Sequence, residues 1–134
     1  MNSNRLGKYW PEALSIVRIV IALLFLEHGT AKLFGFPPPP NPAPAVMTLL
    51  WVQGLFELIG GLLLAIGLFS RTVAFVLAGD MAVAYFMAHA PKNFFPLLNG
   101  GDAAVLYCFI FLVFLVAGPG RWSIDGMLFP SRKS

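Results

Sequence analysis

Residues 13–34 read ALSIVRIVIALLFLEHGTAKLF, a run of mostly apolar side chains that decides the fold. A helix needs about 17–25 such residues to cross the hydrocarbon core of a bilayer. Three further stretches, at 46–69, 72–88 and 101–117, have the same character, and the fourth is short enough to stand nearly upright. The sequence therefore predicts an all-α, four-helix transmembrane bundle in which residues 1–134 form a single domain.

The composition of the 134 residues also points to a membrane protein. The chain is 58% hydrophobic and 11% charged, with a mean hydropathy of +0.79. Soluble domains are about 45–50% apolar and about 25% charged. No basic face with interleaved aromatic residues is present, which argues against nucleic acid as a partner. The single Cys108 excludes an internal disulfide and a CxxC redox pair.

The connections between the predicted spans differ in character. The segment FPPPPNPAP at 36–44 cannot be helical, because proline lacks the backbone donor, and we expect a stiff polyproline II strap. Residues 70–71 leave room only for a tight helical hairpin. Residues 90–100 are apolar but interrupted by proline and glycine, so we expect a loop at the membrane interface. The GPG at 118–120 ends the last helix.

The distribution of positive charge predicts the orientation. The positive-inside rule places the loops rich in lysine and arginine in the cytoplasm. Lys32 and Lys92 lie on one side of the predicted bundle. The N-terminus, the second connection and the C-terminal tail share the other side. These segments carry Arg5, Lys8, Arg71, Arg121, Arg132 and Lys133. We therefore expect an N-in, C-in topology.

Ionisable side chains inside the apolar stretches are the candidates for function. A charge at the bilayer centre costs about 3 kcal/mol, so each must find a partner or a proton. At 1.5 Å per residue from the cytoplasmic ends, Arg18 lies roughly 8 Å deep and Asp80 roughly 13 Å deep. We expect these two to form a structural ion pair. A second layer, between roughly 19 and 23 Å, would contain Glu57, Glu27 and His28, with Lys32 nearer the outer interface.

Helical spacing indicates which of these side chains face a neighbouring helix. Gln53, Glu57 and Gly61 form one i, i+4, i+8 stripe, and His28 and Lys32 share a face of the first helix. Glu27 points roughly opposite Arg18, so it serves another neighbour or a partner subunit. The oligomeric state stays open, and a homodimer is compatible with this pattern.

The count of buried charges implies that a proton is held within the bundle. Arg18 and Lys32 supply two fixed positive charges against three carboxyl groups. Either His28 is protonated or one carboxyl keeps its proton, and Glu57 and Glu27 are the candidates for proton exchange. Two readings remain open: ion pairs that only fix helix register, and a site for protons, a quinone or another ligand.

Some of the same residues are of types that hold metal ions or haem. His28, Glu57, His89 and Asp102 are residue types that bind metals, and His28 and His89 lie at similar depth, as two axial haem ligands would. Two histidines alone predict haem poorly. The sequence predicts no metal and no intrinsic cofactor.

Several short motifs resemble the DoxX family of small four-helix membrane proteins. They are Arg18 followed by FLEHGTAK at 25–32, ELIGGL at 57–62, AHAP at 88–91, FP at 95–96, NGGD at 99–102 and GPGRWSID at 118–125. The match runs from about residue 14 to residue 129. Their order and spacing carry the resemblance.

The resemblance implies a location in the bacterial inner membrane and, from some members of the family, a role beside oxidoreductases. Some DoxX-like proteins are described as membrane subunits of oxidoreductases, including thiosulfate:quinone oxidoreductase. The leading hypothesis is therefore an accessory subunit of a quinone-linked oxidoreductase, which receives electrons from a peripheral partner protein. The alternative is a non-enzymatic scaffold or anchor for such a partner. The ligand-binding candidates are His28, Lys32, Gln53, Glu57, His89 and Asp102.

Overall fold

The computed structural model describes residues 3–40, 44 and 46–130, and every regular element in this part of the chain is helical. The all-α prediction is confirmed. The long helices are α2 (Trp10–Phe34), α3 (Leu49–Ile66), α4 (Ser70–Ala84) and α6 (Asp102–Ala117). The short elements are α1 (Ser3–Gly7), the π-helical turn η1 (Tyr85–His89), α5 (Pro96–Asn99) and α7 (Ile124–Leu128).

Three helical stretches are long and apolar enough to cross a membrane: α2, α3, and α4 continued by η1. The fourth, α6, has 16 residues, in line with the short fourth span expected. Helix α2 begins three residues earlier than predicted. Pro11 lies in its first turn. The N–H groups of a first turn have no partner within the helix, so the missing N–H of proline costs no hydrogen bond there.

The turn between α3 and α4 is tight, as predicted, but lies earlier in the sequence. Gly67 adopts a left-handed conformation, with φ of 72°, and ends α3 at Ile66. Glycine adopts this conformation without steric cost. Residues 70–71, expected to form the hairpin, are therefore the first residues of α4.

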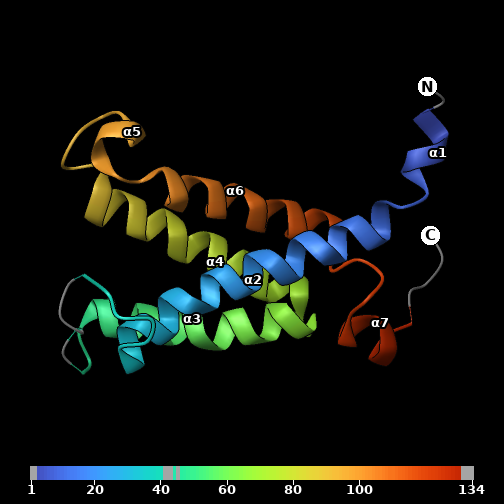
Figure 1. The fold of residues 1–134 in the computed structure, drawn as a ribbon, viewed down its shortest axis with the longest axis horizontal. Helices are drawn as coiled ribbons and strands as arrows, with labels where there is room; N and C mark the ends of the chain where they lie inside the picture. Colours follow the sequence, from blue (N-terminus) through green and yellow to red (C-terminus); the bar gives the residue numbers. More distant parts are fainter. Residues whose placement is uncertain (1–2, 41–43, 45, 131–134) are drawn as a thin grey trace.

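The bundle is built from two helix pairs (Figure 1). Helix α2 packs along α3, and α4 packs along α6, while α3 and α4 join the pairs. Phe25 of α2 meets Phe111 of α6 with 5.0 Å between ring centroids, in an edge-on contact between the two pairs. Both rings are buried, together with Leu64, Leu77 and Phe114. Most other large apolar side chains face outward, as lipid-facing side chains do.

Glycine allows α2 and α3 to approach closely. A Cβ at Gly29 would lie 2.7 Å from the backbone nitrogen of Leu58, and one at Gly61 would lie 3.1 Å from the Cα of Leu26. Small residues at helix contacts are typical of membrane bundles, because they let backbones pack together. The expectation that the stripe carrying Gly61 faces a neighbouring helix is confirmed.

Arg18 fastens the C-terminal segment to the bundle. Its side chain is buried, and its Nε donates to the carbonyl oxygen of Leu64 at 2.9 Å. Its Nη1 and Nη2 donate to the carbonyl oxygens of Pro119 and Trp122. The carbonyl of Leu64 belongs to the last turn of α3, where four carbonyls lack a helical partner. A guanidinium there also interacts favourably with the helix dipole.

The predicted Arg18–Asp80 ion pair is wrong. The ion pairs among the described residues join Lys32 to Glu57 and Arg121 to Glu12. Arg18 lies level with the last turn of α3, whereas Asp80 lies ten residues inside α4. The guanidinium therefore braces the structure through backbone carbonyls.

The two ends of the bundle are distinct. Helices α1 and α7 lie at one end, and residues 36–40 and α5 lie at the other (Figure 1). This arrangement places the N-terminal and C-terminal segments on the same side; which side faces the cytoplasm stays a prediction. Residues 36–40 are non-helical, as expected. Positions 41–43 and 45 of the predicted strap, and Arg132 and Lys133 of the charge count, lie outside the described residues.

Candidate functional site

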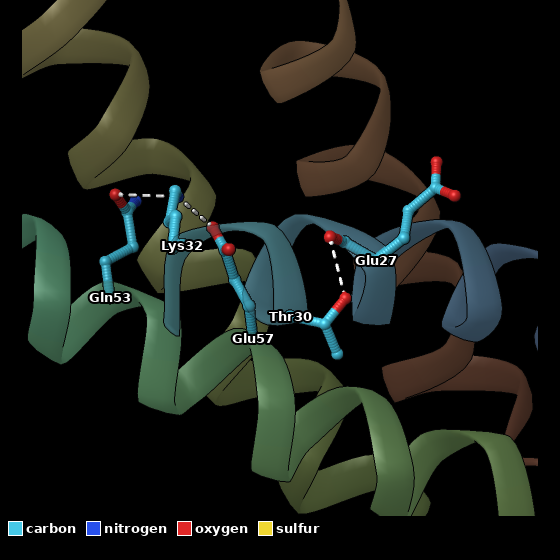
Figure 2. A network of polar contacts seen from close by, with 5 residues as sticks. All are labelled: Glu27, Thr30, Lys32, Gln53 and Glu57. Atoms are coloured by element: carbon cyan, nitrogen blue, oxygen red, sulfur yellow. Dashed lines mark hydrogen bonds and ion pairs between the residues drawn. The ribbon is translucent and has the colours of Figure 1, made fainter. Parts of the chain in front are cut away.

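An ion pair between α2 and α3 lies at the centre of the candidate site. Lys32 Nζ donates to Glu57 Oε1 at 2.7 Å (Figure 2). The side chain of Glu57 is 3% exposed and that of Lys32 is 28% exposed. The close approach of the helices at Gly29 places the backbone of Glu57 directly against α2. A salt bridge this well buried has little water to screen it.

Gln53 extends the ion pair toward α4. It lies one turn before Glu57 on α3, and its Oε1 accepts from Lys32 Nζ at 3.5 Å. Its side chain also lies beside that of Asp80, with which it lines a groove between α3 and α4. Asp80, Gln53, Lys32 and Glu57 therefore form a polar chain across three helices. Among the residues with described positions, Glu57 Oε2 and Asp80 Oδ2 are buried and have no hydrogen-bond partner.

The polar chain places Asp80 in the same layer as Glu57, whereas the sequence predicted it in the layer of Arg18. Helix α3 ends at Ile66 and not at residue 69, so Glu57 lies nine residues, about 14 Å, from that end. Asp80 lies ten residues, about 15 Å, from the start of α4 at Ser70. The two carboxyl groups are therefore at the same depth. The error arose from the unrecognised left-handed stop at Gly67.

A cavity of about 210 Å³ adjoins the ion pair, between the two helix pairs. Its walls combine apolar side chains, such as Phe25 and Met81, with polar ones. The polar side chains that line it are His28, Lys32, Gln53, Glu57, His89 and Tyr107. Five of the six predicted ligand-binding residues are therefore brought together around one cavity.

Tyr107 is the wall residue that sequence reasoning missed. It comes from α6, and its ring stacks on Phe111 at 5.9 Å and meets His28 edge-on at 6.0 Å. His28 is itself exposed, so it lies at the rim. A tyrosine in a phenylalanine-rich span was the available signal, because a hydroxyl at bilayer depth needs a partner.

His89 is oriented by the loop before α6. It ends the π-helical turn, and its Nδ1 lies 3.1 Å from the carbonyl oxygen of Asn99. Asn99 is buried and also donates to Tyr85 Oη and accepts from the backbone of Gly101. Single π-helical turns within helices are frequent at functional sites. The NGGD motif thus positions one wall of the cavity.

Two predicted candidates lie outside the cavity. Glu27 is exposed on α2, and Figure 2 shows its carboxyl group pointing away from Lys32 and Glu57. Glu27 therefore lies on a different face of α2 from the one that lines the cavity. Asp102 is exposed in the first turn of α6, where a negative charge complements the helix dipole.

The described residues contain no group of three histidine, cysteine, aspartate or glutamate side chains that could hold a metal ion. The polar walls supply instead an ammonium, a carboxyl, a carboxamide, a phenol and two imidazoles. These groups donate and accept hydrogen bonds.

A bundle of apolar helices with ionisable groups between them defines a multi-pass membrane protein. Residues 13–90 match the family described as DoxX. The chain belongs to this family. No solved structure matches it.

The similar proteins come from several bacteria. A protein of Haemophilus influenzae, described as uncharacterized, is 41% identical over 94% of this chain and 98% of its own length. An uncharacterized membrane protein of Mycobacterium tuberculosis is 28% identical over 88% of this chain and 82% of its own. The inner membrane protein YqjF of Escherichia coli is 29% identical over 84% of this chain and 89% of its own.

Proposed function

We propose that the protein is an accessory subunit of a quinone-linked membrane oxidoreductase, and that its cavity binds a quinone headgroup. The observation that carries the proposal is the convergence of His28, Lys32, Gln53, Glu57 and His89 on one cavity at bilayer depth. Its volume of about 210 Å³ is below the roughly 300–1,000 Å³ of pockets for drug-sized ligands. It suits a single ring with its carbonyl groups, whose isoprenoid tail would remain in lipid.

The walls match the chemistry of a quinone. Lys32 and His28 are donors for a quinone carbonyl oxygen, and Glu57 exchanges protons with it through the oxygen that lacks a partner. Reduction of a quinone to a quinol takes two electrons and two protons. A peripheral oxidoreductase partner would supply the electrons, and the polar chain would supply the protons.

The polar chain also gives protons a route between two cavities. Gln53 lines both the site cavity and a groove of about 280 Å³ between α3 and α4, into which Asp80 also faces. The polar chain, which ends in the carboxyl groups of Asp80 and Glu57, would therefore connect the groove with the quinone.

The orientation is part of the proposal. We place the protein in the inner membrane with both termini in the cytoplasm, so that the described cations Arg5, Lys8, Arg71 and Arg121 lie on that side. The name of the Escherichia coli relative, an inner membrane protein, supports this location. Reporter fusions at both termini, active only in the cytoplasm, test the topology.

Quinone binding is tested with decylubiquinone and the purified protein in detergent. Trp51 lies two residues before Gln53, so its fluorescence should fall as the quinone binds once Trp10 and Trp122 are replaced by phenylalanine. We expect Glu57→Gln to weaken quinone binding at least about tenfold. Glutamine lacks the carboxylate that holds the Lys32 ammonium beside the cavity, so both polar contacts to the quinone are affected. Glu27→Gln is the matched control, since Glu27 lies outside the cavity.

The scaffold hypothesis predicts a different result. If the buried charges only hold the helices together, Glu57→Gln changes stability and leaves decylubiquinone quenching as it was. Equal binding by the wild type and Glu57→Gln, with both variants helical by circular dichroism, refutes the quinone site. Mass spectrometry of lipids extracted from the purified protein provides the second readout, since a stoichiometric quinone is expected.

A further inference from the structure

A second cavity, of about 720 Å³, lies at the end of the bundle that carries α1 and α7. It forms where the first turns of α2 and α4 meet the C-terminal segment after α6. We call it the terminal cup. Its side chains that matter here are Trp10, Phe69, Ser70, Arg71, Arg121 and Phe129.

Within the described part of the chain, ion pairs do not account for all of the positive charge at the cup. Both carboxylate oxygens of Asp125 accept backbone N–H groups at the start of α4, at 2.7 and 2.8 Å. Arg121 pairs with Glu12 at 2.8 Å. Arg71 is exposed and makes no ion pair within the described part of the chain. The cup therefore offers one guanidinium without an ion pair to any described residue and a second, that of Arg121, which is paired with Glu12.

The guanidinium of Arg71 is positioned at the cup by its contact with the end of α6, and the residue before it, Ser70, has a hydroxyl without a hydrogen-bond partner among the described residues. A Cβ at Gly118 would lie 3.1 Å from Arg71 Nη2, so the guanidinium rests on the end of α6. The adjacent Ser70 is fully buried, and its Oγ has no hydrogen-bond partner among the residues that the structure describes. Buried hydroxyls are normally satisfied, so this one indicates a missing acceptor or donor.

The remaining walls are those of a membrane interface. Trp10, Phe69 and Phe129 are exposed around the cup. Tryptophan and other aromatic side chains gather at the level of the lipid headgroups. Leu14 and Ala117 make an apolar base that continues toward the spanning helices. Guanidinium groups above an apolar base match a molecule with a phosphate at one end and acyl chains at the other.

We propose that the terminal cup binds the headgroup of an anionic phospholipid, with Arg71 and Arg121 on its phosphate. The site faces the leaflet on the side of the termini, and basic pockets between spanning helices on the cytoplasmic side bind such headgroups. A lipid is favoured over an acidic protein segment because the cup opens between apolar helix ends. The proposal does not depend on quinone binding.

Native mass spectrometry of the delipidated protein tests the site with phosphatidylglycerol and phosphatidylethanolamine of the same acyl chains. We expect phosphatidylglycerol adducts to persist at higher activation energy. Arg71→Gln should weaken phosphatidylglycerol binding about fivefold, the value of one arginine near an anionic surface. Lys92→Gln is the matched control, since Lys92 is exposed at the opposite end and should leave binding unchanged.

The outcomes separate the alternatives. Equal retention of both lipids, or equal loss with Arg71→Gln and Lys92→Gln, overturns the proposal. Displacement of phosphatidylglycerol by millimolar inorganic phosphate would assign the site to free phosphate, and binding of an acidic peptide without lipid preference would assign it to a protein; either result overturns it. Because Arg71 is exposed, Arg71→Gln should stay folded, and a shift in its thermal midpoint by phosphatidylglycerol provides a second measure.

Discussion

Replacing Lys32 by methionine should lower the free energy of unfolding far more than the partial exposure of the Lys32 side chain suggests. The substitution leaves the Glu57 carboxylate, with 3% of its side chain exposed, without a charged partner. Breaking a buried ion pair from one side costs about 3–5 kcal/mol of unfolding free energy. Glu57→Gln removes the buried charge itself and leaves Lys32 able to reach water, so it should cost only about 1 kcal/mol.

A double-mutant cycle measures the coupling directly. The double variant Lys32→Met/Glu57→Gln lacks both charges. We therefore expect its free energy of unfolding to fall by about 1–2 kcal/mol, which corresponds to a coupling energy of at least about 2 kcal/mol between the two side chains. The assay is reversible unfolding by sodium dodecyl sulfate in mixed micelles, followed by circular dichroism. Because a neutral carboxyl is cheaper to bury than a carboxylate, the penalty of Lys32→Met should shrink as the pH falls.

Additivity would refute this reasoning. If the loss in the double variant equals the sum of the single losses within about 0.5 kcal/mol, the two side chains are not coupled. Glu27→Gln provides the control, because its exposed carboxyl group should change the unfolding free energy by less than about 0.5 kcal/mol.

Three further substitutions, one of them with a matched control, test the residues that hold the site in place. Arg18→Lys should lower the unfolding free energy by about 2–3 kcal/mol, since lysine cannot reach the several carbonyls at once, and proteolysis of residues 119–130 should accelerate. Gly29→Ala should cost about 1–3 kcal/mol through contact with the α3 backbone, whereas Gly79→Ala, which has open space, should be neutral or gain up to about 1 kcal/mol by the same unfolding assay. Asn99→Ala should increase amide hydrogen exchange across residues 93–101, and unchanged exchange would contradict its role as the anchor of that loop.

The sequence predicted the helices well because the bilayer imposes their length. Apolar runs must be helical in lipid, where backbone groups have no water to bond. The boundaries at Trp10 and Ile66 were missed by three residues each, since proline and glycine extend or stop helices through local backbone conformation. The short helices α5 and α7 lack a periodic pattern long enough to be recognised.

The sequence predicted which residues belong to the candidate site better than it predicted which side chains pair with one another. Stripes such as Gln53, Glu57 and Gly61 identified the facing surfaces, because helical periodicity is a local property. The partner of Arg18 was not local: it depends on how the GPGRWSID segment folds back under the bundle. A chain that leaves a helix can return to any carbonyl within reach, and residue counting along spans cannot predict that contact.

The two groups of buried polar residues differ in a way that bears on function. Arg18 donates to carbonyls from Nε, Nη1 and Nη2, and a residue that only stabilises a fold is expected to be satisfied in this way. Glu57 and Asp80 each keep one buried oxygen without a partner, beside cavities that face lipid or the bundle interior. Selection for stability alone would favour donors for these oxygens or apolar replacements, since an unsatisfied buried oxygen costs about 1–3 kcal/mol. A buried oxygen without a partner, next to open volume, is the arrangement that a site for a hydrogen-bonding ligand or a moving proton requires.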